Sequence, residues 1–303
     1  MGQLNLINSS TAVLIGADGF LGSHLRRSLA NIGQNVISSS RRLIPEQSTN
    51  TFHLDLSKPD EIHSNLTFGA VSIICGAIVG FEECSVDPAL SWQVNVEAPA
   101  IFSRLNADRG VRTVLISSNA VFSGDIFMPN EETTTGAKTE YGRQKEAAEK
   151  HVLGTSPDNQ IIRVSKLVAH DIDTFMSWFE NIGNGRKIWA DEDVRRAPVH
   201  VNDAAHIISR IATECPGGIY HISGDRDLTY YEMAQRMIGE LGGDQAQLIP
   251  RQRSRMIPEI EDLKPHTAMS MRRTMNILQI NQPSSDDAVQ SIIDELNRIK
   301  SQT

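Results

Sequence analysis

Cysteine is scarce in this chain of 303 residues, which has only Cys75, Cys84 and Cys215. Their spacing matches no metal-ligand pattern, and three cysteines are too few for a disulfide framework. We therefore expect buried free thiols and no metal site.

Long apolar runs and a surplus of basic residues are also missing. No run approaches the roughly 20 apolar residues that a membrane helix needs, and residues 1–11 are polar, unlike a targeting peptide. The formal net charge is −8, whereas nonspecific nucleic-acid binding draws on excess Lys and Arg. We expect a cytoplasmic protein that binds neither membrane nor nucleic acid, in which local arginines would have to hold any anionic substrate.

What the first half does contain is an alternation of strand and helix patterns. The apolar, β-branched run 11–15 ends at Gly16, helical spacing of apolar residues follows over 20–32, and a second apolar run covers 35–39. Further strands are predicted at 51–54, 71–75, 113–117 and 161–164, with helices at 90–105 and 141–152. Parallel strands joined by crossover helices predict an α/β fold with a doubly wound parallel sheet of the Rossmann type.

The second half is less regular. We assign residues 1–165 to a Rossmann domain and 166–303 to a smaller C-terminal substrate-binding lobe. Within 200–225, a helix pattern and the apolar run 218–222 are expected to return to the sheet. The prolines of 250–265 punctuate the lobe, and the tail 284–300, which opens with Ser-Ser-Asp-Asp, predicts a capped amphipathic helix.

A glycine-rich turn lies between the first predicted strand and helix. Gly16, Gly19 and Gly22 are separated by two residues each, with Phe20 and Leu21 inside the turn. A backbone without side chains can approach a pyrophosphate, and the helix N-terminus offers free N–H groups and partial positive charge. We assign all five residues to a dinucleotide site; a purely structural turn is the alternative.

The end of the second strand bears on which dinucleotide binds. An acidic residue there would hold the ribose hydroxyls, but the sequence has Ser40, Arg41 and Arg42. Two cations and no carboxylate suit a ribose 2′-phosphate, so NADPH (NADP) is favoured and NAD is the alternative. The arginines could instead simply cover helix ends. Asp55, followed by Leu56, is placed after the third strand to accept a hydrogen bond from the adenine amino group.

Tyr141 and Lys145 stand four residues apart in a predicted helix and therefore share one face. A nearby ammonium favours the ionised phenol, which lowers its pKa. Such a tyrosine can exchange a proton with a carbonyl or alcohol oxygen while hydride moves at the carbon. Without the glycine turn, the pair would be read as a solvated helix face.

Taken together, these motifs resemble the extended short-chain dehydrogenase/reductase family over nearly the whole chain. The resemblance rests on the glycine turn, on the strand end with Ser118 and the segment 121–124 that follows it, and on Tyr141-Gly142-Arg143-Gln144-Lys145. Within that family, the chain looks most like dTDP-4-dehydrorhamnose reductases and related nucleotide-sugar reductases and epimerases.

The resemblance implies catalytic roles. Ser118 would hydrogen-bond the substrate carbonyl, Tyr141 would supply the proton and contact the cofactor, and Lys145 would lower the pKa of the tyrosine and bind the nicotinamide ribose. A hydroxyl at the carboxyl end of a strand can donate to an oxygen that gains negative charge, which suits Ser118.

Substrate contacts are implied in the C-terminal lobe. Arg196 lies in a segment, 194–203, similar to the family segment whose arginine binds the substrate diphosphate, and guanidinium forks match phosphate oxygens. Pairing of Arg196 with Asp191 or Asp193 is the alternative. Further candidate lining residues are Trp178, Asn181, Lys187 and Trp189.

In two comparisons the chain differs from relatives that catalyse other reactions. Dehydratases carry an Asp-Glu pair where this chain has Asn119 and Ala120, which argues against dehydration. GDP-fucose synthases use a cysteine at the place of Asn119 and a histidine at that of His170. Asn119 is kept as a substrate contact, and His170 is either a substrate-side acid or an incidental loop residue.

The leading function is NADPH-dependent reduction of a keto group, at C4, on a nucleotide-linked sugar. An NAD-dependent 4-epimerase is the first alternative, although Ser40 and Arg41 argue against it. A noncatalytic regulatory subunit is the second, although Ser118, Tyr141 and Lys145 are intact. Relatives commonly form dimers, so a homodimer is also open.

Overall fold

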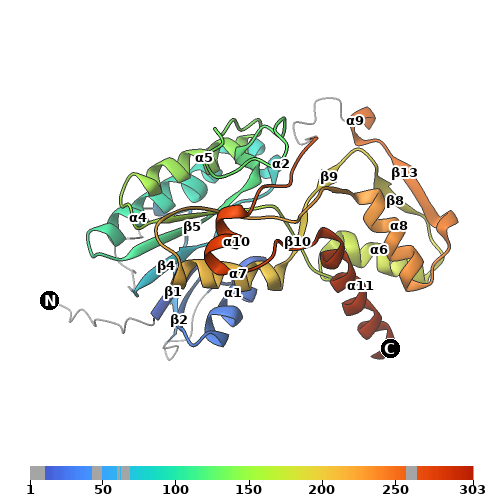
Figure 1. Ribbon diagram of the computed structural model, residues 1–303, viewed down its shortest axis with the longest axis horizontal. Coiled ribbons are helices and arrows are strands. Elements are labelled where there is room, and N and C mark those ends of the chain that lie inside the picture. The colour runs from blue at the N-terminus through green and yellow to red at the C-terminus, as the bar shows by residue number, and fades with distance from the viewer. Residues whose placement is uncertain (1–10, 43–49, 60–61, 63–68, 257–264, 303) are drawn as a thin grey trace.

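The computed structural model describes residues 11–42, 50–59, 62, 69–256 and 265–302. Residues 1–10 and the part 257–264 of the proline-punctuated stretch lie outside the described residues. A layered α/β part contains the first half of the chain, and a smaller lobe with α6, α8 and α11 lies beside it (Figure 1).

The central sheet has seven parallel strands in the order β11-β6-β5-β4-β1-β2-β3. They are β1 (Thr11–Ile15), β2 (Asn35–Ser40), β3 (Thr51–His53), β4 (Val71–Ile74), β5 (Arg112–Ser118), β6 (Gln160–Val164) and β11 (Gly218–Ile222). The Rossmann-type prediction is confirmed. Strand order changes direction between β1 and β4, and ligands of such sheets bind beyond the carboxyl ends of the strands at this point.

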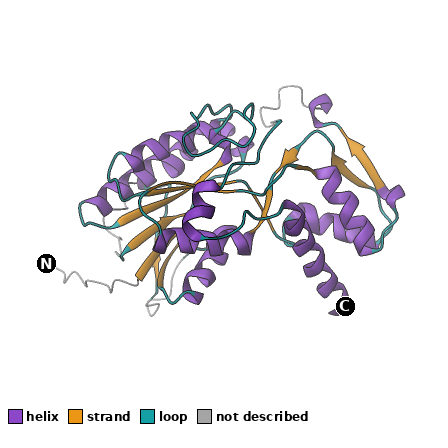
Figure 2. Cartoon of the chain, viewed as in Figure 1, coloured by secondary structure: helices purple, strands orange, loops and turns teal. Residues whose placement is uncertain are grey.

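Helices cover both faces of the sheet (Figure 2). One face carries α1 (Phe20–Asn31), α7 (Val201–Glu214) and α10 (Arg272–Leu278); the other carries α4 (Ala98–Ala107) and α5 (Glu140–Leu153). Successive strand residues point to opposite faces, so Leu14 of β1 is buried in the first layer and Val13 in the second. Before α4 the chain forms α2 (Phe81–Val86), α3 (Pro88–Trp92) and a π-helical segment, Gln93–Glu97.

The smaller lobe has its own apolar core. It is built from α6 (Asp173–Gly183), α8 (Tyr230–Leu241), α11 (Ser285–Gln302) and the parallel pair β8 (Ile188–Asp191) and β13 (Leu248–Arg251). Phe175, Trp178, Met237 and Ile292 are buried there together. Shorter elements are β7 (Lys166–Val168) with β10 (Pro198–His200), β9 (Arg195–Arg196) with β12 (Leu228–Thr229), α9 (Arg253–Met256) and the 3-10 turns Asn119–Val121 and Gln245–Gln247.

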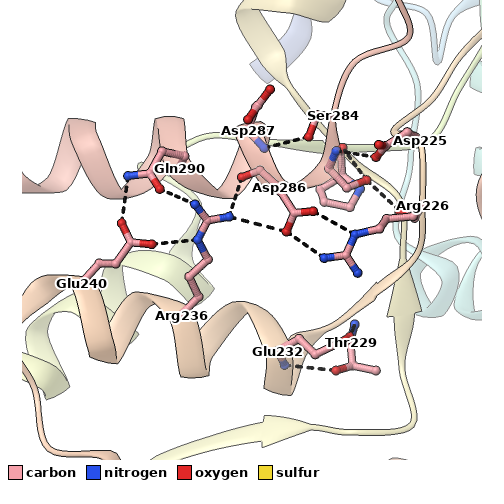
Figure 3. Close-up of polar contacts among 12 residues, drawn as sticks. Asp225, Arg226, Thr229, Glu232, Arg236, Glu240, Ser284, Asp286, Asp287 and Gln290 are labelled. Carbon is pink, nitrogen blue, oxygen red and sulfur yellow. Dashed lines mark hydrogen bonds and ion pairs between the residues drawn. The ribbon is translucent and has the colours of Figure 1, made fainter.

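A charged network joins α11 to α8 (Figure 3). Asp286 accepts two hydrogen bonds from Arg226, at 2.7 and 2.9 Å, and lies 3.5 Å from Arg236, which also donates to Glu240 at 2.8 Å. Ser284 caps α11 by accepting from the N–H of Asp287 at 3.2 Å. These side chains are partly exposed, so each pair contributes at most about 1 kcal/mol. The buried face of α11 therefore carries most of its attachment.

The part that returns to the sheet extends beyond 200–225. Helix α10 packs on β11, and its neighbour Met271 and its last residue, Leu278, are buried in the same core as β1. Within the described ranges, none of the helices combines the length and apolarity needed to cross a membrane.

Candidate active site

A cavity of about 1480 Å³ extends from the glycine turn, past the carboxyl ends of β4 and β5, to the smaller lobe. All but one of the residues that the sequence assigned a catalytic, cofactor-binding or substrate-contact role line it. They are Gly16, Gly19, Phe20, Leu21, Gly22, Ser40, Arg41, Arg42, Asp55, Leu56, Ser118, Asn119, Tyr141, Lys145 and Arg196. The cavity thus brings together residues that are up to 180 positions apart in the sequence.

The glycine turn is tight because two backbone segments meet there. Gly16 has φ +87°, and a Cβ on it would lie 2.4 Å from the backbone nitrogen of Gly76. A Cβ on Gly22 would lie 2.1 Å from the carbonyl oxygen of Gly16. Helix α1 starts after Gly19 with no side chain capping it, so its first N–H groups remain available for an anion.

The end of β2 forms a hydrogen-bonded cluster with this turn. Ser39 Oγ accepts from the N–H of Gly16 at 2.9 Å. Ser40 donates its hydroxyl proton to Asp18 Oδ2 at 2.5 Å and accepts from the N–H of Arg42 at 3.0 Å. Asp18 lines the cavity. Sequence reasoning gave it no role, although its place directly before Gly19 was a signal.

Asp55 is held in its ionised form. Burial alone would raise the pKa of this carboxyl, but the side-chain and backbone donors of Ser57, at 2.8 and 3.0 Å, and the charge of Arg41 bring the pKa below its ordinary value. An ionised carboxylate is a hydrogen-bond acceptor. Its predicted contact with adenine stays a prediction.

Tyr141 meets Ser118 because the start of α5 approaches the turn after β5 very closely. A Cβ on Gly142 would lie 2.3 Å from the carbonyl oxygen of Ala120, so only glycine allows this approach. Thr139 caps α5 by accepting from the N–H of Gly142 at 3.1 Å. Ser118 is the last residue of β5, accepts from the N–H of Ala120 at 3.1 Å and hydrogen-bonds the side chain of Tyr141.

The protonation of the pair differs from expectation. Burial raises the pKa of Tyr141 to about 12, although its hydrogen bond with Ser118 acts in the opposite direction. Burial also lowers the pKa of Lys145 to about 8, with the charge of Glu149 opposing the change. The net pKa of Tyr141 lies above its ordinary value because desolvation of the phenolate dominates, and the contribution predicted for Lys145 stays a prediction. At neutral pH the phenol keeps its proton.

A buried charged network lies behind the pair. Glu149, one turn after Lys145, accepts from Ser117 Oγ at 2.5 Å and from Arg163 Nη2 at 2.7 Å. The side chains of Arg163 and Glu149 are only 3% and 4% exposed. Arg163 also lies 3.4 Å from His221 Nε2, and burial together with this cation lowers the pKa of His221 to about 3. The network ties α5 to β5, β6 and β11 beneath the cavity.

Asn119 connects the active edge of the sheet to the later part of the chain. Its Nδ2 donates to the carbonyl oxygen of Thr267 at 2.9 Å, and its Oδ1 lies 3.3 Å from Ser118 Oγ. Thr267 Oγ1 donates to Asp227 at 2.6 Å and accepts from the N–H of Ala197 at 2.8 Å. Thr267 lines the cavity, and no local pattern in the sequence marked it.

Arg196 lies at the cavity end formed by the smaller lobe. Asp191 and Asp193, its two predicted alternative partners, have other donors. Asp191 pairs with Arg251 and Arg253, and Asp193 accepts from Ser254 Oγ at 2.6 Å. The cavity is also lined by Lys166, Arg251 and Arg253, which sequence reasoning missed, and by Trp178 and Trp189, whereas Asn181 and Lys187 are not among its lining residues.

His170, which the sequence assigned as a possible substrate-side acid, does not line the cavity. Its Nδ1 lies 2.9 Å from the carboxylate of Glu295 on α11, and the same carboxylate is 3.4 Å from His200 Nε2. This placement gives a substrate-side role no support. Among the described residues, no three or more His, Cys, Asp and Glu side chains gather as a metal site would require.

The sequence matches the profile of a family described as the RmlD substrate binding domain over residues 10–298. The chain belongs to the RmlD substrate binding domain family. Its fold and sequence identify it as an enzyme of the extended short-chain dehydrogenase/reductase type, as the motifs predicted.

Several proteins resemble this RmlD family member along most of their length. A probable dTDP-4,6-dihydroxy-2-methyloxan-3-one 4-ketoreductase of Streptomyces antibioticus is 27% identical over 245 residues, 78% of this chain and 79% of that protein. The dTDP-4-dehydrorhamnose reductase of Mycobacterium tuberculosis is 23% identical, covering 88% of this chain and 86% of that protein. The crystal structure of dTDP-4-dehydrorhamnose reductase from Bacillus anthracis, in complex with NADP, has a TM-score of 0.79 at 19% identity, covering 94% of this chain and 99% of that one.

Proposed function

We propose that this RmlD family member is an NADPH-dependent reductase of the C4 keto group of a nucleotide-linked sugar. The observation that carries the proposal is the meeting of Ser118, Tyr141 and Lys145 in one cavity that runs from the glycine turn to Arg196. The names of the similar Streptomyces and Mycobacterium proteins, both reductases of dTDP-linked sugars, support this substrate class.

The first end of the cavity fits a dinucleotide. Gly16 and Gly22 allow the tight turn, because a Cβ on either would collide with backbone atoms, and the uncapped start of α1 offers N–H donors for a pyrophosphate. Arg41 and Arg42 would hold a 2′-phosphate, Asp55 the adenine and Lys145 the nicotinamide ribose. When bound, NADPH supplies the hydride. The side chains of the cavity would transfer the proton and stabilise the developing charge.

Tyr141 suits the role of general acid in a reduction. With a pKa of about 12 it holds its proton at neutral pH and can pass it to a carbonyl oxygen as that oxygen gains negative charge. Ser118, hydrogen-bonded to the phenol, is placed to share the same oxygen. Lys145, a cation below its pKa of about 8, stabilises the phenolate that the transfer leaves.

The other end of the cavity would take the nucleotide diphosphate. Arg196, with Arg251 and Arg253 nearby on the cavity wall, supplies positive charge in an otherwise acidic protein. In this proposal residues 1–165, with 200–225, bind the cofactor, and the rest of 166–303 binds the substrate.

The test is turnover of NADPH with a dTDP-4-keto-6-deoxy sugar, followed by loss of NADPH absorbance. Tyr141→Phe removes the proton donor and should lower kcat by about 100-fold or more, while calorimetry should still detect NADPH binding, because the glycine turn, Arg41 and Lys145 remain. Tyr231→Phe, a tyrosine that does not line the cavity, is the matched control and should retain full activity.

Two other results would redirect the assignment. Conversion of a nucleotide sugar to its 4-epimer without net loss of NADPH would replace the reductase by the epimerase. Absence of turnover with every 4-keto nucleotide sugar, together with normal NADPH binding, would favour a noncatalytic subunit.

A further inference from the structure

The carboxylate of Asp18 lies at the end of the cavity where a ribose 2′-phosphate is predicted to bind. The end of β2 carries no acidic residue, and two arginines there favour a 2′-phosphate. Asp18 comes instead from the glycine turn, yet its Oδ2 accepts from Ser40 Oγ at 2.5 Å, at the end of that same strand. Asp18, Ser40 and Arg41 line the same end of the cavity.

The hydrogen bonds of the serines limit what the site can donate to a phosphate. Ser40 has a single hydroxyl proton, which it gives to Asp18, and its oxygen already accepts from the N–H of Arg42. The N–H of Gly16 is likewise directed to Ser39 Oγ. Among the described residues at the end of β2, the side chains of Arg41 and Arg42 can still donate to a phosphate, and they must act beside a carboxylate.

We propose that Asp18 is a specificity-determining residue of the cofactor site, which accepts a hydrogen bond from the adenosine ribose 2′-hydroxyl and disfavours a 2′-phosphate. It supplies from the glycine turn the acceptor that β2 lacks. A carboxylate attracts a hydroxyl donor and repels a phosphate, whereas Arg41 and Arg42 do the reverse. The two influences oppose each other, so the site discriminates weakly and accepts NADH as well as NADPH.

The proposal rests on the dinucleotide site of the proposed function and is tested by binding alone. Calorimetry measures the Kd of two fragments, adenosine 2′,5′-bisphosphate and 5′-AMP, and of NADPH and NADH. Asp18→Asn removes the charge and keeps the shape; it should shift the ratio of the two fragment affinities towards the bisphosphate by roughly tenfold, the size of one charge-assisted hydrogen bond or repulsion. Arg41→Ala should shift the ratio in the opposite direction.

Two further variants serve as controls. Asp18→Ala should shift the ratio in the same direction as Asp18→Asn, which shows that the effect belongs to the carboxylate rather than to the new amide. Asp125→Asn, at an exposed aspartate that does not line the cavity, should leave the ratio unchanged.

The outcomes separate this inference from the proposed function. If both fragments bind the wild type and neither Asp18 variant changes their ratio, the role of Asp18 is wrong and the reductase proposal stands. If the wild type binds neither fragment nor either dinucleotide, the cofactor site itself is wrong, and both proposals fall together.

Discussion

Gly142 determines the position of Tyr141 relative to the turn after β5. The sequence motif marked the tyrosine and the lysine, but the glycine between them has its own physical reason, since its missing side chain lets α5 approach Ala120. That approach brings the phenol to Ser118. The placement of Tyr141 and Lys145 therefore depends on a backbone contact as well as on helical spacing.

Gly142→Ala tests this contact. The new Cβ would lie 2.3 Å from a backbone oxygen, so the helix start must shift, at a cost of about 1–3 kcal/mol in the free energy of unfolding. Urea denaturation measures the loss, and kcat should fall with it because Tyr141 moves. Gly136→Ala, where a Cβ meets nothing within 4 Å, should change neither; equal stability of the two variants would contradict the account.

The pH dependence of reduction should follow Lys145 rather than Tyr141. The pKa of Lys145 is about 8 and that of Tyr141 about 12. As pH rises through 8, Lys145 loses the proton that makes it a cation, so stabilisation of the developing phenolate weakens while the phenol still holds its proton. A profile of kcat should fall above about pH 8. A profile flat to pH 10 would mean that the lysine charge does not act on this step.

At the scale of elements, α5 is attached by a buried ion pair. Glu149 pairs with Arg163 of β6 at 2.7 Å with both side chains almost fully buried, so removing one charge leaves the other without compensation. The pair lies one helical turn beyond Lys145 and fixes the helix that carries it.

Glu149→Gln should destabilise the protein by about 3–5 kcal/mol, measured as the free energy of unfolding in urea. Its matched control is Glu146→Gln on the same helix. This carboxylate pairs with Lys150, whose side chain is 74% exposed, and also accepts from Thr135 and Ala137, to which a glutamine oxygen can still bond, so the change should cost less than about 1 kcal/mol. Similar losses of unfolding free energy in both variants would show that the buried ion pair stabilises the protein no more than the exposed one.

The sheet was predictable because most of its strands contain short β-branched and apolar runs that are bounded by local signals. The runs 11–15 and 218–222 coincide with β1 and β11, and α1 ends at Asn31, close to the left-handed Gly33. Strands β9 and β12, by contrast, have two residues each and are defined by pairing with each other across more than 30 positions. Such short strands have no periodicity, so the sequence could not mark them.

For the molecule as a whole, the cofactor half of the site was easier to predict than the substrate half. Glycines, Tyr141 and Lys145 follow from local motifs, and all of them line the cavity. Thr267 and Arg251 reach it only through tertiary packing, and Asp18 gains its place through a contact with Ser40, 22 positions later. The raised pKa of Tyr141 likewise depends on burial, which helical spacing alone does not reveal.

The central claim is that hydride passes to the sugar carbon while Tyr141 protonates the oxygen. The most direct measurement uses NADPH deuterated at the transferable position with a dTDP-4-keto-6-deoxy sugar and locates the label in the product. We predict one deuterium at C4 for each NADPH consumed, with labelled product lost in Tyr141→Phe. Formation of an epimer without NADPH loss, or NADPH loss with no deuterium at C4, would contradict the account.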